Sequence, residues 1–318
     1  MRTQVPTTGV RVLSPEESKK QRRTAINLSL VVGFGMLAGK WYAFLITGSA
    51  AILSDAAESV VHVLAVIFAA FSLWLSTKPP DASHPYGHEK ISFFSAGVEG
   101  ALIVLAALVI IYQAVLKLVV GIELENLGTG SLFVAGAASI NAGLGYFLVW
   151  QGKRLGSLIL IANGKHVLTD SWTSFGVIVG LLLTMWTGWL PFDPIFAILV
   201  ALNITWSGGK LIRQSIGGLM DEGDAEIEAR IRDIVSLEAR NRDLRYHELR
   251  YRYTGTSLWV ELHLIFPPST PIERAHWQAT EIEAAIQSAL PLPVTVTTHL
   301  EPEDTHDRAH RQLKDTSE

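Results

Sequence analysis

The sequence predicts a membrane protein with two parts: an all-α bundle of six transmembrane helices and a C-terminal α+β domain with the order α-β-β-α-β. The first observation is composition, because 49% of the 318 residues are hydrophobic although 18% are charged. The second observation is that the hydrophobic and the charged residues occupy different parts of the chain. Residues 1–24 are polar, residues 25–213 are mostly apolar, and the chain beyond residue 221 is charged and mixed. This order indicates a membrane domain followed by a domain in water.

Six apolar stretches divide the first part. Each is long enough to cross a hydrocarbon core of about 30 Å at a helical rise of about 1.5 Å per residue. The expected helices cover residues 25–46, 50–77, 91–119, 130–151, 157–186 and 193–213. The expected organisation is an N-terminal tail (1–24), a transmembrane domain (25–213), a second domain (214–302) and a disordered tail (303–318).

Among the connections between the predicted helices, only alternate ones carry positive charge. Lys and Arg occur before the first helix, after the second and fourth, and at the end of the sixth, for example Lys19, Lys78, Lys90, Lys153 and Arg213. The connections at 48–50, 121–131 and 187–194 contain neither. Short loops rich in Lys and Arg stay in the cytoplasm, so both termini are expected to be cytoplasmic.

The second domain shows both helical and strand periodicity. Residues 223–237 have an apolar face that includes Ile227 and Ile231, and residues 272–289 are expected to form a second helix. Alternating patterns predict strands over residues 244–253, 257–266 and 293–300.

Two of the membrane helices carry ionisable pairs at helical spacing. Glu58 and His62 are four residues apart in the second helix, as are His166 and Asp170 in the fifth. Residues at this spacing share one face of a helix. If the two faces meet, two imidazoles and two carboxylates converge, a ligand set that suits tetrahedral Zn²⁺. The alternative is that these side chains only form hydrogen bonds between helices.

Two further acidic residues have no assigned role. Asp55 lies one turn before Glu58 and could join the site or orient its ligands, and Glu99 lies within the third helix. Ionisable residues within a membrane helix are costly and are functional by default.

The remaining histidines suggest two more clusters. The chain has no Cys, so every metal ligand must be nitrogen or oxygen. Asp81, His84 and His88 have ligand-like spacing in the loop after the second helix, although a solvated loop is an equal alternative. The second domain contains His247, His263, His276, His299 and Glu301, which strand spacing could gather at one edge or leave scattered over the surface.

These motifs resemble those of the cation diffusion facilitators. The segments that carry the resemblance are Ser54-Asp55-Ala56 leading into Glu58 and His62, the loop from His84 to Lys90, and the segment His166-Val167-Leu168-Thr169-Asp170. The resemblance runs from about residue 25 to residue 302. It implies six membrane helices with a metallochaperone-like cytoplasmic domain.

The resemblance also implies roles for individual residues. The transport site falls on Glu58, His62, His166 and Asp170, and Glu58 with His62 departs from the Asp–Asp or His–Asp pair usual in the family. The loop site falls on Asp81, His84 and His88. A binuclear cytoplasmic site falls on the four histidines of the second domain and on Glu301, and the family commonly has Asp at the position of Glu301. Asp221, in the segment Leu219-Met220-Asp221, is implied to pair with Lys90 near the dimer interface.

The expected function is therefore efflux of a divalent transition metal. We expect a homodimeric Zn²⁺/H⁺ antiporter that works by alternating access in a bacterial inner membrane, with Fe²⁺, Co²⁺, Ni²⁺, Cd²⁺ or Mn²⁺ as alternative ions. No cofactor is expected beyond the transported and regulatory metal, and no nucleic-acid partner. The rival classes are an intramembrane metallo-enzyme and a non-transporting scaffold. The enzyme is disfavoured because the chain lacks a His-Glu-x-x-His segment, and because four protein ligands leave no open metal position for water.

Overall fold

The computed structural model describes residues 15–47, 50–120, 129–290 and 292–303. The chain divides into two compact units, the first ending at Ile216 and the second beginning at Gly217. Along the described residues, the elements follow the predicted order of six long helices and then α-β-β-α-β. The predicted fold class is therefore confirmed.

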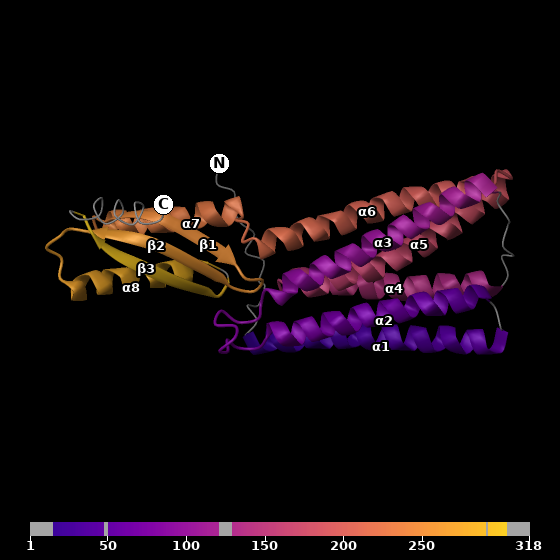
Figure 1. Ribbon diagram of the computed structural model, residues 1–318, viewed down its shortest axis with the longest axis horizontal. Helices are drawn as coiled ribbons and strands as arrows, with labels where there is room; N and C mark the ends of the chain where they lie inside the picture. Colours follow the sequence, from indigo (N-terminus) through magenta and orange to yellow (C-terminus); the bar gives the residue numbers. More distant parts are fainter. Residues whose placement is uncertain (1–14, 48–49, 121–128, 291, 304–318) are drawn as a thin grey trace. The chain divides into compact units, whose positions relative to one another are not determined.

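The first unit is built mainly of long helices (Figure 1). Three of them, α1, α3 and α6, contain described windows long and apolar enough to cross a membrane. The helices are α1 (Pro15–Thr47), α2 (Ala50–Ser76), α3 (Ile91–Val120), α4 (Thr129–Arg154), α5 (Leu158–Thr187) and α6 (Phe192–Leu219).

The first helix begins ten residues before the predicted start at residue 25. Pro15 fixes the φ angle of the first turn, and Glu16 and Glu17 place negative charge at the positive end of the helix. Apolar periodicity, on which the prediction rested, does not detect such a polar extension. The extension also has a tertiary partner, because the Arg22 guanidinium donates a hydrogen bond of 2.5 Å to the carbonyl of Leu155.

Glycines allow α4 and α5 to approach closely. A Cβ atom built on Gly145 would lie 2.9 Å from the carbonyl oxygen of Gly164, and one built on Gly164 would lie 2.9 Å from that of Gly145. Small residues that let backbones touch are typical of membrane helix interfaces. A hydrophobic cluster that includes Leu148, Ile159 and Val167 packs around this contact. Since α5 also packs against α2 and α3, it is a central helix of the bundle.

The second unit is a three-stranded sheet covered on one face by two helices. The elements are α7 (Ala225–Asn241), β1 (Arg245–Tyr253), β2 (Leu258–Phe266), α8 (Ile272–Ala289) and β3 (Val294–Pro302). The strand order is β1-β2-β3, with β1 antiparallel and β3 parallel to β2.

The core of the second unit follows from alternation along β2. Leu262 and Leu264 point to one face and pack with Ile231 of α7 and Ile282 of α8. His263, between them in sequence, therefore points to the face that neither helix covers in the described residues. Asp224 caps α7 by accepting hydrogen bonds from two backbone N–H groups of its first turn.

Candidate metal sites

The first group of potential ligands lies between α2 and α5. His62, His166 and Asp170 each offer one nitrogen or oxygen atom, and these atoms all lie within 4.8 Å of one another. His62 Nδ1 is 3.2 Å from Asp170 Oδ2, and the two imidazole centroids are 5.1 Å apart. The structure thus brings together three of the four residues predicted for the membrane site. The side chains of Glu58 and Asp55 lie outside its described part.

Local helix geometry and packing place this group. His166 and Asp170 face the same way because they are one turn apart on α5. The start of α5 is tied to α1, since the Ser29 hydroxyl donates a 2.9 Å hydrogen bond to Asn163 Oδ1. Close contact with α4 at Gly164, two residues before His166, holds this part of α5 directly against α4.

A further carboxylate reaches this group from α3. Glu99 is only 1% exposed, and its Oε2 atom lies 2.9 Å from Nδ1 of His166. Neither Glu99 oxygen accepts a hydrogen bond from a described group. The sequence showed an acidic residue within an apolar helix, but it did not show that this residue meets the fifth helix.

The second group is the loop cluster between α2 and α3. Asp81, His84 and His88 offer ligand atoms within 4.8 Å of one another, as their spacing predicted. Asp81 Oδ2 lies 3.3 Å from His88 Nε2, and Asp81 Oδ1 lies 3.3 Å from His84 Nδ1. His84 is largely exposed, whereas the side chain of His88 is 8% exposed.

Asp81 also organises its own loop. Its Oδ1 atom accepts hydrogen bonds from the Ser83 hydroxyl at 2.8 Å, the His84 backbone N–H at 2.7 Å and the Ser83 backbone N–H at 2.9 Å. These bonds, first that of the Ser83 hydroxyl and then that of the His84 N–H, lower the pKa of Asp81 to about 2. The Asp81 carboxylate is therefore ionised in the folded protein at neutral pH.

The third group lies on the open face of the sheet in the second unit. His247, His263 and His299 are direct cross-strand neighbours on β1, β2 and β3, so their rings form one row. Adjacent ring centroids are 4.9 Å and 4.8 Å apart. Glu301 lies two residues beyond His299 and hence on the same face. Its oxygens lie 2.9 Å from His247 Nε2, 2.8 Å from His263 Nδ1 and 3.6 Å from His299 Nε2.

Two residues of this unit differ from the predicted arrangement. His276 is exposed on α8, which packs against the opposite face of the sheet, so within one chain it lies apart from the histidine row. Glu248, which the sequence did not single out, lies 3.8 Å from His263 Nε2. A β-bulge after His247 turns Glu248 toward this face, and its φ of 49° is left-handed. Regular strand alternation could not reveal such a bulge.

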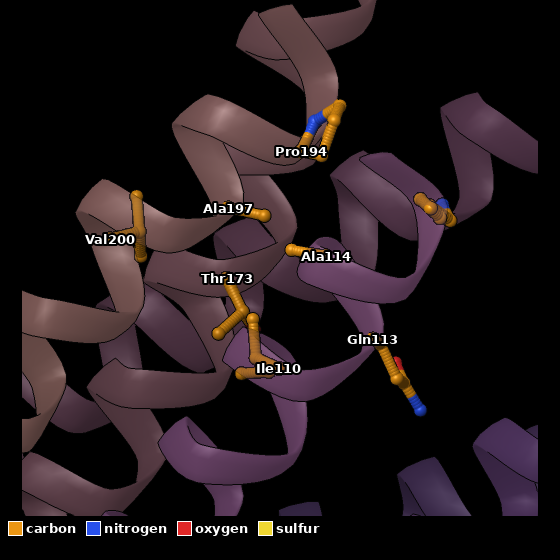
Figure 2. A pocket seen from close by; sticks show the side chains of 8 residues that line it. Ile110, Gln113, Ala114, Thr173, Pro194, Ala197 and Val200 are labelled. Carbon is orange, nitrogen blue, oxygen red and sulfur yellow. The ribbon is translucent and has the colours of Figure 1, made fainter. Parts of the chain in front are cut away.

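A cavity of about 130 Å³ lies among α3, α5 and α6. Ala114 and Ala197 point toward each other across it (Figure 2). Its lining contains no His, Asp or Glu, so it is distinct from the membrane group, although Thr173 lies only three residues after Asp170. The lining residues are Ile110, Gln113, Ala114, Lys117, Thr173, Pro194, Ala197 and Val200.

Comparison with known proteins assigns both units. Residues 26–220 match the cation efflux transmembrane domain, and residues 224–303 match the cytoplasmic domain of cation efflux proteins. The chain belongs to the cation diffusion facilitator family. It is therefore an integral membrane protein of a family of cation efflux transporters rather than enzymes.

Several relatives of this cation diffusion facilitator match over most of their length. An uncharacterised transporter of Synechocystis sp. is 36% identical over 86% of this chain and 88% of its own. The zinc transporter ZitB of Escherichia coli is 28% identical over 80% of each chain. The cation-efflux pump FieF of Klebsiella pneumoniae is 26% identical over 80% of this chain and 85% of its own.

Proposed function

We propose that this cation diffusion facilitator exports a divalent transition metal, Zn²⁺ foremost, through a site formed by Glu58, His62, His166 and Asp170. The observation that carries the proposal is the meeting of two imidazoles and a carboxylate, from two membrane helices, within 4.8 Å. Mixed nitrogen and oxygen ligands suit Zn²⁺ and leave Fe²⁺, Co²⁺, Ni²⁺ and Cd²⁺ as alternatives. Mn²⁺ fits less well because it prefers oxygen. The similarity to a zinc transporter supports Zn²⁺ as the first ion to test.

Proton exchange follows from the chemistry of these ligands. Imidazole changes its charge near neutral pH, and a protonated ring cannot accept a metal ion. His62 and His166 would therefore release metal as protons arrive, so the affinity of the site should fall as pH drops from about 8 to about 6. Inward proton flow would then drive metal out of the cytoplasm by alternating access.

The loop cluster of Asp81 and the histidine row with Glu301 fit regulatory or delivery roles on the cytoplasmic side of the membrane. With both termini in the cytoplasm of a bacterial cell, the second unit would sense cytoplasmic metal through its histidine row and Glu301. An ion shared by three strands would stabilise the sheet, because a ligand that binds only the folded state raises its stability. We propose that the protein works as a homodimer joined through this unit, and that the loop cluster of Asp81 is a third binding site.

The test is metal flux into liposomes that contain the purified protein, with and without a proton gradient. His166→Ala and Asp170→Ala are expected to abolish both Zn²⁺ flux and the coupled proton movement while the protein stays folded. Ser171→Ala is the matched control, because this neighbour on α5 donates a hydrogen bond to the backbone carbonyl of Val167 and is not one of the potential ligands. Wild-type flux in the His166 or Asp170 variant would refute the site, and flux indifferent to the gradient would refute antiport.

A further inference from the structure

Glu99 is the most deeply buried carboxylate among the described residues that touch a predicted metal ligand. It is 1% exposed on α3, and its Oε2 atom lies 2.9 Å from Nδ1 of His166. An ionised carboxylate within a membrane helix is energetically costly unless a partner compensates its charge. Neither of its oxygens accepts a hydrogen bond from a described group. Such a group needs a positively polarised partner, and the nearby ring of His166 is the one that the structure provides.

Glu99 contacts His166 without belonging to the group of potential ligands that His166 forms with His62 and Asp170. The atoms of His62, His166 and Asp170 that lie within 4.8 Å of one another include none from Glu99. An imidazole has two nitrogens on different edges, and the carboxylate occupies the edge of Nδ1. That leaves Nε2 of His166 as the nitrogen for the metal ion.

Packing holds Glu99 at this position. Its neighbour Gly100 lies against α6, where a built Cβ would be 3.0 Å from the carbonyl oxygen of Gly208. The backbone of α3 therefore cannot approach α6 further, and α3 also packs against α5. A carboxylate on a backbone held in this way is well suited to fix one orientation of a neighbouring ring.

We propose that Glu99 is a positioning residue for the membrane metal site, an inference that rests on the proposed function. When a metal ion binds, the Glu99 carboxylate accepts the Nδ1 proton of His166. It thereby selects the tautomer whose Nε2 is free and makes that nitrogen a stronger donor. Carboxylate partners of metal-binding histidines act in this way, and their loss typically weakens metal affinity about 10–100-fold. The transport site would thus extend over three helices, with α3 controlling affinity without contacting the ion.

The test uses Co²⁺, whose visible absorption reports the number and geometry of its ligands. Full-length protein in detergent would carry His84→Ala and His263→Ala, so that the titration reports the membrane site. Glu99→Gln, which keeps the size of the side chain, is expected to weaken Co²⁺ binding about 10–100-fold while the spectrum at saturation stays unchanged. Ser95→Ala is the matched control, since it removes another buried polar group of α3 and should leave affinity unaltered.

Other results of the Co²⁺ titration would refute either the role of Glu99 or the proposed function. Unchanged affinity in Glu99→Gln would refute the positioning role, and an altered spectrum would make Glu99 a ligand instead. If Glu99→Gln does not fold, Glu99→Asp decides, because a carboxylate withdrawn by one methylene should also weaken binding, and equal affinity would refute the inference. If the parent protein binds no Co²⁺, or if His166→Ala leaves the spectrum intact, the proposed function fails rather than the role of Glu99.

Discussion

Replacing Gly145 with alanine is expected to damage the membrane site without changing any potential ligand. The added Cβ would lie 2.7 Å from Leu168 Cγ, 2.9 Å from the Gly164 carbonyl oxygen and 3.0 Å from the Leu168 backbone nitrogen. Two of these atoms are backbone of α5, so the helix itself must move. Leu168 lies midway between His166 and Asp170, and a shift there displaces both residues.

The magnitude follows from two opposing effects. Ordinary contacts begin near 3.4 Å, so the two helices must separate by about half an ångström, and overpacking of this kind costs about 1–3 kcal/mol. Alanine also favours the helix over glycine by about 0.5–1 kcal/mol. Gly143→Ala on the same helix isolates this second effect, because a Cβ at Gly143 meets nothing within 4 Å. The two variants should therefore differ in unfolding free energy by about 1–3 kcal/mol, with Gly145→Ala the less stable.

The assay is unfolding in mixed micelles of increasing SDS content, followed by circular dichroism, together with Zn²⁺ flux in liposomes. Gly143→Ala should match or exceed wild-type stability and transport normally, whereas Gly145→Ala should lose both stability and flux. Equal stability and equal flux in the two variants would show that the contact between α4 and α5 does not set the geometry of the site.

Three further predictions address the other ligands. Glu301→Gln should reduce the rise in melting temperature that Zn²⁺ causes in the full-length protein, because the mutation removes the charge that contacts all three rings of the histidine row; an undiminished rise would contradict this. The pKa of Asp81 is lowered to about 2, below its unfolded value of about 3.9, so its contribution to loop stability is present above about pH 4 and is lost as pH falls toward 2. Because the Asp81 carboxylate is ionised at both pH 8 and pH 6, Asp81→Asn should weaken Zn²⁺ binding by the loop equally at these two pH values. Weaker Zn²⁺ binding at only one of them would count against Asp81 as a ligand of the loop site. Changing both Glu58 and His62 to Asp should raise the flux of Mn²⁺ relative to Zn²⁺ in a metal panel, because oxygen ligands favour harder ions; an unchanged profile would place selectivity elsewhere.

The sequence alone was sufficient for the features that depend on local periodicity. Long apolar stretches predicted the helical bundle, and alternation along β2 separated the buried leucines from His263. The spacing of His166 and Asp170 placed both on one face of α5, because four residues make about one helical turn. The membrane ligands could thus be proposed before any fold was known.

Only the tertiary structure decided which faces meet. Glu99 reaches His166 because α3 packs beside α5, and no periodicity within either helix encodes that pairing. A bulge brings Glu248 toward His263, and packing of α8 on the covered face keeps His276 away from the open face in one chain. In the helical unit, the close contact of Gly145 with Gly164 likewise joins the backbones of two different helices. Local patterns determine which side of an element is polar, but long-range packing determines what that side contacts.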